Sequence, residues 1–273
     1  MAERKVESLL NAIENFDEKS NNVNENDLVE IDKWIISEAI KLHEEVQKLN
    51  DNYAYHHVIQ KIHNFCVHEL GGVYLDIIKD RMYVTKSNSY ARRSAQFALF
   101  EVADILIRLI SPILVFTAEE IWQSHELFKK QSVSIFMASQ KILSEIESSI
   151  SDEDWKKIFA VKDAVNQSIE KARADSIIKG SLDSKISISC DKKTFKALQK
   201  IEDELKFVFI SSEVEIAESS NSGLDIEVNN FDQKKCIRCW NKCSSVGLYA
   251  EDPEICSRCY TNVYGDGEIR KFV

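Results

Sequence analysis

Glycine and proline are scarce in this sequence. The 273 residues include seven glycines and two prolines, whereas 44% are hydrophobic and 29% are charged. Because glycine and proline disfavour helices, their scarcity argues against a chain built from many tight turns and favours long helices. The sequence therefore predicts a mainly α fold.

The sequence also lacks an apolar run that could cross a membrane. Its most apolar region, residues 94–124, is interrupted by Glu101, Asp104 and Arg108, and charges are costly in lipid. No positively charged start leads into an apolar stretch, so we expect no secretory signal. Cysteines at metal-ligand spacing favour a reducing compartment. We therefore predict a cytoplasmic protein with no membrane partner.

Motifs that bind nucleotides or catalytic zinc are missing as well. The sequence contains no G-x-G-x-x-G, no phosphate-binding loop and no H-E-x-x-H. These three motifs are typical of dinucleotide sites, nucleotide sites and zinc-dependent proteases, respectively. We therefore predict no catalytic residue in this chain.

Four cysteines near the C-terminus are the strongest positive signal. Cys236 and Cys239 form one C-x-x-C pair, Cys256 and Cys259 form a second, and sixteen residues separate the pairs. This spacing is typical of a tetrahedral Zn²⁺ site, and four thiolates leave no open coordination position for water. We therefore predict one structural zinc ion, which replaces the hydrophobic core that so short a segment cannot build.

Two other interpretations of the cysteines are open. A thiol redox protein could use the two C-x-x-C pairs, but no thioredoxin-like βαβ pattern surrounds Cys236 or Cys256. A zinc-containing scaffold could bind another polypeptide, which agrees with the net charge of −10. Cys243 lies outside the paired spacing, and we interpret it as a spare thiol.

Cations and aromatic residues flank the cysteine pairs. Arg238 and Trp240 lie on either side of one cysteine, and Arg258 and Tyr260 lie on either side of another. A metal-bound turn that carries a ring and a cation can stack an unpaired base and contact a phosphate. Alternatively, the rings cover the zinc site. The two interpretations are evenly balanced for Trp240, whereas covering is favoured for Tyr260.

Positive charge is concentrated in one segment. Residues 156–200 contain eleven Lys or Arg and five Asp or Glu, a balance of +6, although the whole chain carries −10. The rest of the chain therefore carries −16. This asymmetry permits an anionic partner, and a solvated helix face explains it equally well.

Apolar residues at spacings of three and four predict helices in the first part of the chain. Thr117 and Glu120 have the form of a capping box, which predicts that a helix begins there. Gly71 and Gly72 lie inside another predicted helix, where we expect the close approach of another backbone. We assign residues 1–150 to an antiparallel helical bundle. The predicted helices are residues 27–49, 58–83, 90–111 and 117–128.

The pattern changes after residue 150. A helix is predicted from Ser151 to about Gly180, and alternation with a period of two then predicts short strands. We assign residues 151–230 to a small α+β domain and residues 231–273 to the cysteine module. The predicted strands are residues 185–190, 213–216 and 224–228, with a helix at 192–204.

Several segments resemble bacterial isoleucyl-tRNA synthetase. Three of them are similar to the anticodon-binding helical domain of that family, and five later segments are similar to the rest of its C-terminal region. The first three are residues 74–83 (YLDIIKDRMY), 91–96 (ARRSAQ) and 111–122 (SPILVFTAEEIW). The later ones are residues 165–175 (VNQSIEKARAD), 180–182 (GSL), 235–240 (KCIRCW), 255–259 (ICSRC) and 265–272 (GDGEIRKF).

The resemblance implies a function for the chain. It implies a C-terminal part of a class I aminoacyl-tRNA synthetase that holds the anticodon stem-loop of tRNA(Ile). The family's H-I-G-H and K-M-S-K-S motifs are absent, so we expect no enzymatic activity from this chain alone, and ATP is used only by the full-length parent. The expected partners are the N-terminal catalytic and editing domains, and we expect a monomer.

The resemblance also implies roles for individual residues. The four paired cysteines match the zinc ligands of the family. Lys235, Arg238 and Trp240 match its first knuckle, and we expect them to contact tRNA. The basic segment 156–200 is expected to contact phosphates.

Overall fold

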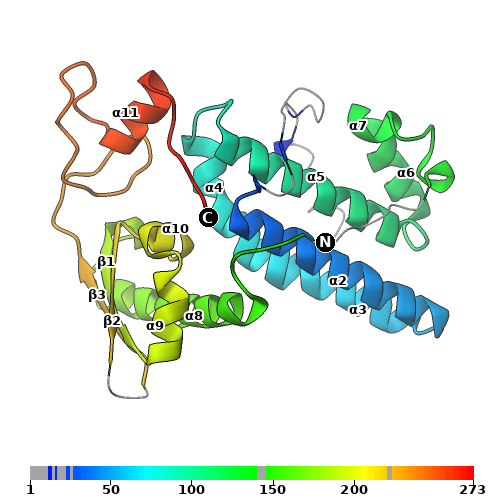
Figure 1. Cartoon of the computed structure of the whole chain (residues 1–273), viewed down its shortest axis with the longest axis horizontal. Helices are drawn as coiled ribbons and strands as arrows, with labels where there is room; N and C mark the ends of the chain where they lie inside the picture. Colours follow the sequence, from blue (N-terminus) through cyan, green and yellow to red (C-terminus); the bar gives the residue numbers. More distant parts are fainter. Residues whose placement is uncertain (1–11, 14–15, 17–22, 25–26, 140–145, 220–222) are drawn as a thin grey trace. The chain divides into compact units, whose positions relative to one another are not determined.

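Figure 1 shows the computed structural model of the chain, which describes residues 12–13, 16, 23–24, 27–139, 146–219 and 223–273. The chain divides into two compact units. Unit 1 consists of Met1–Asp76 and Arg92–Ser148, and unit 2 consists of Ile77–Ala91 and Ser149–Val273. No helix in the described part of the chain is long and apolar enough to cross a membrane.

Unit 1 is helical, as predicted, and its centre is α5 (Tyr90–Ile110). Nearly every residue of α5 from Ser94 onward is buried, because the helix is apolar on all sides and such helices lie inside a core. On α2 (Glu30–Asp51), the buried face includes Ile31, Ile35 and Ala39, as the periodicity predicted. The remaining elements are α3 (Tyr55–Phe65), η2 (Cys66–Tyr74), the start of α4 (Leu75–Val84), α6 (Val115–Ser124), α7 (Glu126–Lys129) and η3 (Ile135–Met137).

A buried polar cluster joins three helical segments of unit 1. The Asp32 carboxylate on α2 accepts hydrogen bonds from the Tyr74 hydroxyl at 2.7 Å and from the Ser94 hydroxyl at 2.5 Å. The backbone N–H of Val29 donates to the Ser94 hydroxyl oxygen at 2.9 Å. Because a buried carboxylate is costly unless it is hydrogen-bonded, this cluster specifies how α2, η2 and α5 meet.

Two expectations for unit 1 are wrong. The helix predicted at 58–83 contains a π-helical segment, η2, and a Cβ on Gly72 would lie 3.2 Å from the Val67 carbonyl oxygen of that same segment. The close approach at Gly72 is therefore to its own helix, where i→i+5 bonding brings that carbonyl near. A side chain at this position would crowd the π-helical turn.

The capping box is the second error. Helix α6 begins at Val115 after Leu114, with no side-chain cap, so Thr117 lies inside the first turn. The predicted helix 117–128 also breaks at His125, whose extended backbone separates α6 from α7. Glu119, which precedes the predicted capping residue Glu120, accepts hydrogen bonds from the Ser134 hydroxyl and the Ile135 N–H. The carboxylate next to the predicted capping residue thus makes a tertiary contact, and the start of α6 has no side-chain cap.

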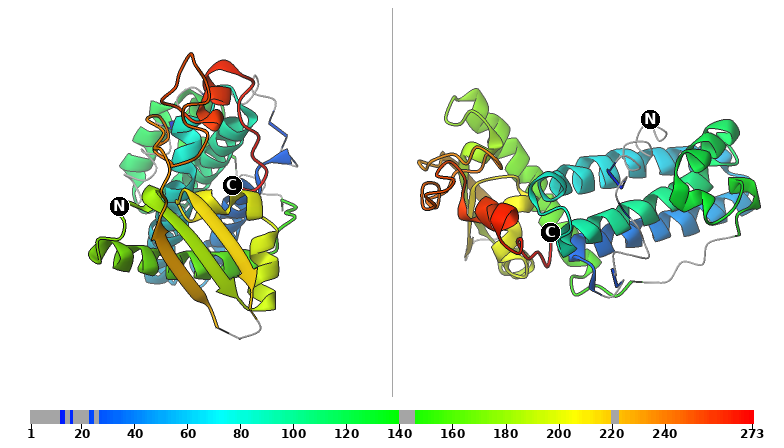
Figure 2. Two further views of the ribbon diagram at one scale, coloured as in Figure 1. Left: turned by 90° about the vertical axis from the view of Figure 1, so that its left-hand side faces the viewer. Right: turned by 90° about the horizontal axis from the view of Figure 1, so that it is seen from above.

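Unit 2 contains a three-stranded sheet of order β2-β1-β3, which Figure 2 shows face-on. Strand β1 (Ser184–Cys190) pairs in parallel with β2 (Glu213–Glu218) and antiparallel with β3 (Asp225–Asn230). Buried and half-buried residues alternate along β1, as period-two patterning predicts. The small sheet within a mainly α fold is therefore confirmed.

Helices α8 (Asp152–Ala174) and α9 (Lys192–Gln199) pack against this sheet. The Ser151 hydroxyl oxygen caps α8 by accepting from the Asp154 N–H at 3.2 Å. Both helices end earlier than predicted. Beyond α9 the chain forms η5 (Glu202–Glu204) and α10 (Leu205–Val208) in place of one continuous helix to residue 204.

Candidate metal centre

The first cysteine pair lies on a tight turn. The Trp240 N–H donates to the Cys236 carbonyl at 2.9 Å, and the Cys236 N–H donates to the Asn241 carbonyl at 2.9 Å. A bridge between Lys235 and Lys242 continues this pairing. The turn gives Trp240 a φ of +66°. We call residues 235–242 the first knuckle.

The second cysteine pair begins helix α11 (Ser257–Tyr264). Cys256 is the N-cap residue of α11, and Cys259 lies in its first turn. Backbone N–H groups at a helix start favour negative charge, which suits thiolates. The Cys256 N–H lies 3.3 Å from the Cys236 sulfur, and the Ile237 N–H donates to the Glu254 carbonyl at 3.1 Å. These contacts hold the two pairs together.

The structure brings the four paired cysteines together. Their sulfurs lie within 4.8 Å of one another, all four residues are buried, and the Cys239 and Cys256 sulfurs are 3.7 Å apart. Tetrahedral coordination with Zn–S bonds of about 2.3 Å needs sulfurs roughly 3.8 Å apart. Four thiolates in a tetrahedral arrangement suit zinc or an iron–sulfur centre, and two C-x-x-C pairs at this spacing are typical of structural zinc. The cluster therefore fits a structural zinc ion.

The electrostatics of the cluster support a cation at its centre. Hydrogen bonding from Cys256 and Cys259, with help from the charge of Arg258, holds the pKa of Cys239 far below the ordinary thiol value. Hydrogen bonding with Cys239 is the main cause of the raised pKa of Cys256, and it also raises the pKa of Cys259, although the bond with Cys256 acts in the opposite direction on Cys259. Protons shared among the sulfurs thus stabilise one thiolate. A divalent cation would replace these protons and stabilise all four thiolates.

Cys243 lies outside the group of four. Its sulfur is 3.3 Å from the Ser245 hydroxyl, and the side chain packs against the edge of the cluster. The Ser245 hydroxyl also accepts from the Ser257 N–H at 3.1 Å. This placement agrees with the interpretation of Cys243 as a spare thiol.

The end of α4 forms one side of the cluster, which sequence reasoning missed. The Val84 side chain is buried among the cysteines, and the Arg238 guanidinium donates to the Val84 carbonyl at 2.6 Å. Lys86 donates to the Gly265 carbonyl at 2.9 Å. More than 150 residues separate Val84 from Arg238. No local pattern in the sequence signals this contact, because the α4 segment has only the pattern of an ordinary amphipathic helix.

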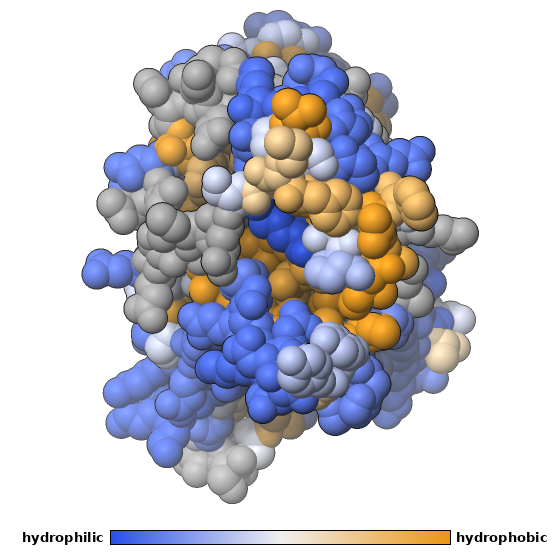
Figure 3. Space-filling model, turned by 90° about the vertical axis from the view of Figure 1, so that its right-hand side faces the viewer, coloured by the Kyte–Doolittle hydropathy of each residue, from blue (hydrophilic) through white to orange (hydrophobic). Residues whose placement is uncertain are grey.

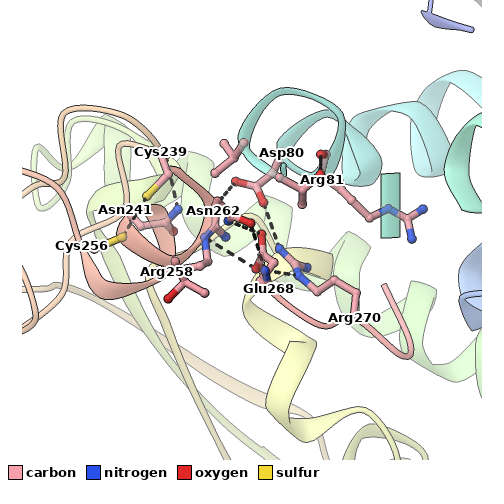
Figure 4. Close-up of polar contacts among 12 residues, drawn as sticks. Asp80, Arg81, Cys239, Asn241, Cys256, Arg258, Asn262, Glu268 and Arg270 are labelled. Atoms are coloured by element: carbon pink, nitrogen blue, oxygen red, sulfur yellow. Dashed lines mark hydrogen bonds and ion pairs between the residues drawn. The ribbon is translucent and has the colours of Figure 1, made fainter. Parts of the chain in front are cut away.

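Asp80, also on α4, joins two arginines of the cysteine module (Figure 4). Its carboxylate pairs with Arg258 at 2.7 Å and with Arg270 at 3.1 Å. Glu268 pairs with Arg270 at 3.0 Å, and the Arg270 guanidinium lies 3.2 Å from the centre of the Phe207 ring. Burial alone would lower the pKa of Arg258, but Asp80 and Glu268 outweigh burial and raise it. Burial is the main cause of the lowered pKa of Arg270.

The predicted nucleic-acid residues have different environments. Trp240 is 62% exposed and therefore does not cover the cluster. Tyr260 packs against the cluster and stacks on Tyr249, with ring centres 3.8 Å apart. Arg238 is half-buried against Val84, whereas Lys235 is exposed, with its nearest acidic oxygen on Asp183 at 4.0 Å.

The helical region and the cysteine module of this chain each match a known protein family. Residues 32–188 match the family model for the anticodon-binding domain of tRNA ligase, and residues 233–262 match a zinc finger found in FPG and IleRS. The chain is 39% identical over 277 residues to the isoleucine–tRNA ligase of Alcanivorax borkumensis and 40% identical over 276 residues to that of Pseudoalteromonas translucida. Both alignments cover 97% of this chain and 29% of the relative. The chain thus spans less than a third of the length of these relatives.

Proposed function

The chain belongs to the family of anticodon-binding domains of tRNA ligases, and from this premise we propose that it is the tRNA-binding part of an isoleucine–tRNA ligase. In this proposal the chain holds the anticodon stem-loop of tRNA(Ile). A catalytic domain outside this sequence uses ATP to join isoleucine to the tRNA. One Zn²⁺ on Cys236, Cys239, Cys256 and Cys259 keeps the knuckles rigid.

The conformation of Trp240 is the observation that carries this proposal. A bulky residue with a φ of +66° is strained, at a cost of about 1–3 kcal/mol. An exposed indole gains little packing energy to offset that strain. A ring on a metal-fixed turn is suited to stack on an unpaired base, which contributes about 1–3 kcal/mol per base. The strain and the exposure together support a ligand-binding role.

The cations near Trp240 suit the tRNA backbone. Lys235 is exposed and can contact a phosphate. Arg238 donates one N–H to the Val84 carbonyl, and its guanidinium has further donors for a phosphate. In the proposal, Lys235 and Arg238 therefore contact the backbone while Trp240 stacks a base.

The basic segment 156–200 offers less than its composition suggests. Lys162 is buried and donates to the Val208 carbonyl at 3.0 Å. Three other lysines pair with carboxylates: Lys157 with Glu153, Lys185 with Glu215 and Lys200 with Asp154. We therefore propose that the first knuckle, and not this segment, is the principal phosphate contact.

A tRNA titration tests the proposal. Trp34, Trp122 and Trp155 are buried, so quenching by iodide should report mainly on Trp240. Addition of tRNA(Ile) transcript to the zinc-loaded chain should protect Trp240, more than a tRNA with another anticodon does, and less at higher salt because of counterion release. Equal protection by both tRNAs, or none at either salt concentration, would refute the proposal.

The variant Trp240→Ala tests the proposed residue. We expect the affinity for tRNA(Ile) to fall about 5- to 150-fold, because one stacking contact is lost. Zinc content should stay at one per chain. If the variant lost its zinc, the indole would be a structural part of the knuckle and its proposed stacking role would be wrong. A variant that bound tRNA normally would refute the stacking role directly.

The remaining domains of the synthetase are the second proposed partner. Unit 1 exposes a group of large apolar side chains near α6, and Figure 3 shows apolar side chains gathered around a hollow on one face. Such a group is larger than isolated surface residues explain. The group consists of Ile113, Leu114, Val115, Phe116, Val133, Phe136 and Met137.

We propose that the catalytic part of the protein covers this apolar group. The variant Phe116→Ser should then weaken association with a separately expressed catalytic part, and unchanged association would contradict the proposal.

A further inference from the structure

Tyr83 has no assigned role, and it lies next to the contact that joins α4 to the first knuckle. Its neighbour Val84 packs into the cysteine cluster and accepts the hydrogen bond from Arg238. Arg238 is in turn two residues before Trp240. Each partner of this hydrogen bond therefore has an aromatic residue within two positions of it in the sequence, Tyr83 beside Val84 and Trp240 after Arg238.

Contacts on both sides hold Tyr83 in place relative to the knuckle. Asp80 pairs with Arg258 at 2.7 Å, and Lys86 donates to the Gly265 carbonyl at 2.9 Å. Residues four apart share one face of a helix, so Asp80 and Val84 form the face that contacts the cysteine module. Tyr83 is three residues after Asp80 and thus lies at the edge of that face. Contacts of Asp80 and Lys86 with the cysteine module therefore hold the backbone on both sides of Tyr83.

The side chain of Tyr83 is directed away from the protein. It is 83% exposed, and within the described part of the chain its hydroxyl has no hydrogen-bond partner and its ring no aromatic neighbour. Tyr260 and Tyr264 of the cysteine module differ from Tyr83 because both have partners. Their rings lie 4.9 Å apart, and the Tyr264 hydroxyl donates to Asp252 at 3.2 Å. Tyr83 and Trp240 are the two most exposed aromatic residues of unit 2.

We propose that Tyr83 is a second stacking residue, which binds an unpaired base of the same RNA segment that Trp240 binds. This inference rests on the proposed tRNA-binding function and deepens it. A rigid amphipathic ring loses little conformational entropy on binding, and it stacks on any base without reading a hydrogen-bond pattern. The cations Lys235 and Arg238 lie on the knuckle, where they can contact the backbone between the two bases.

Four variants test this inference by titration with tRNA(Ile) transcript. Tyr83→Ala should weaken binding about 5- to 150-fold, the range that one stacked base supports. Tyr83→Phe should bind within about threefold of wild type, because the ring is kept. The double variant with Trp240→Ala should show roughly the product of the two single effects. Tyr55→Ala, which removes an exposed tyrosine of unit 1, is the matched control and should bind as wild type does.

The outcomes separate this inference from the proposed function. If Trp240→Ala weakens binding and Tyr83→Ala does not, the role of Tyr83 is refuted and the tRNA-binding function stands. If Tyr83→Phe is as weak as Tyr83→Ala, the hydroxyl makes the contact and stacking is refuted. If wild type fails to bind tRNA at all, both proposals fail. Zinc content measured on each variant must remain one per chain, since zinc loss in Tyr83→Ala would assign Tyr83 a structural role and overturn the inference.

Discussion

The core around α5 and the core of the cysteine module are filled by different chemistry. Around α5 the buried side chains are almost all aliphatic or aromatic, and Trp122 and Phe128 stack with ring centres 5.2 Å apart. In the module, four of the seven buried residues of the cluster are cysteines, and one of the other three, Val84, comes from α4. The bundle depends on packed area, whereas the module depends on what its sulfurs bind.

In each region one carboxylate joins segments that are distant in the sequence, and the two carboxylates have different partners. Asp32 in unit 1 accepts from the neutral hydroxyls of Tyr74 and Ser94. Asp80 in unit 2 pairs with the charged groups of Arg258 and Arg270. The comparison teaches that the small module joins distant segments with ion pairs to Asp80. The larger bundle is filled mainly by apolar packing, and its buried ion pairs, such as Arg108 with Asp104, join residues one helical turn apart.

Replacing one of the four clustered cysteines should have the largest effect, and it should disrupt the module while the bundle stays folded. We expect Cys256→Ser to lose zinc and the order of the module, because structural zinc contributes about 10–16 kcal/mol in small zinc modules. The helices of unit 1 contain no ligand and should remain folded. Zinc content and far-ultraviolet circular dichroism measure the two effects separately. Cys243→Ser is the control and should keep one zinc ion; a zinc-loaded Cys256→Ser would show that the cluster is not the site.

A cavity in the bundle should have the opposite effect, because it should destabilise unit 1 and leave the zinc content of the module unchanged. Trp122 is fully buried and its indole N–H donates to the Ser132 carbonyl at 3.0 Å. Trp122→Ala should lower the free energy of unfolding of unit 1 by about 3–5 kcal/mol, measured by urea denaturation, with zinc content unchanged. Phe116→Ala, which shortens a side chain that is 90% exposed, should change that free energy by less than about 0.5 kcal/mol. Comparable losses in both variants would contradict the assignment of the core.

The smallest effect should come from an ion pair near the surface of unit 2. The hydrogen bond from Lys200 at 2.7 Å, assisted by Ser151, lowers the pKa of Asp154 despite partial burial. A lowered carboxylate pKa stabilises the fold above the unfolded pKa of about 3.9, and that contribution is lost as the pH falls through the folded value.

The variant Asp154→Asn measures this contribution. At pH 7 we expect it to lower the free energy of unfolding by about 0.2–1 kcal/mol, and the difference from wild type should vanish as the pH approaches the folded pKa of Asp154. Lys200→Met removes the same pair from the other side and should give a similar loss at pH 7. If the difference in the free energy of unfolding between Asp154→Asn and wild type grew as the pH fell, the pKa of Asp154 would not be lowered in the folded protein.

Local patterns in the sequence were sufficient for most of the helices, for the three strands and for the cysteine cluster. The spacing of the four cysteines predicted a cluster that the structure contains, and the apolar periods predicted the helices and the three strands. The errors lie in where helices begin and end and in the π-helical segment η2. At Thr117 the sequence has the form of a capping box, but α6 begins two residues earlier, at Val115, with no side-chain cap.

The sequence by itself determined which residues could hold zinc and which segments could form helices or strands, because those properties depend on neighbours within a few positions. Only the tertiary structure decided that Asp80 and Val84 belong with the cysteine module. Their partners Arg258 and Arg238 are more than 150 residues away in the chain. No short-range pattern encodes such a pairing, because it forms only when the folded backbone brings the end of α4 against the module.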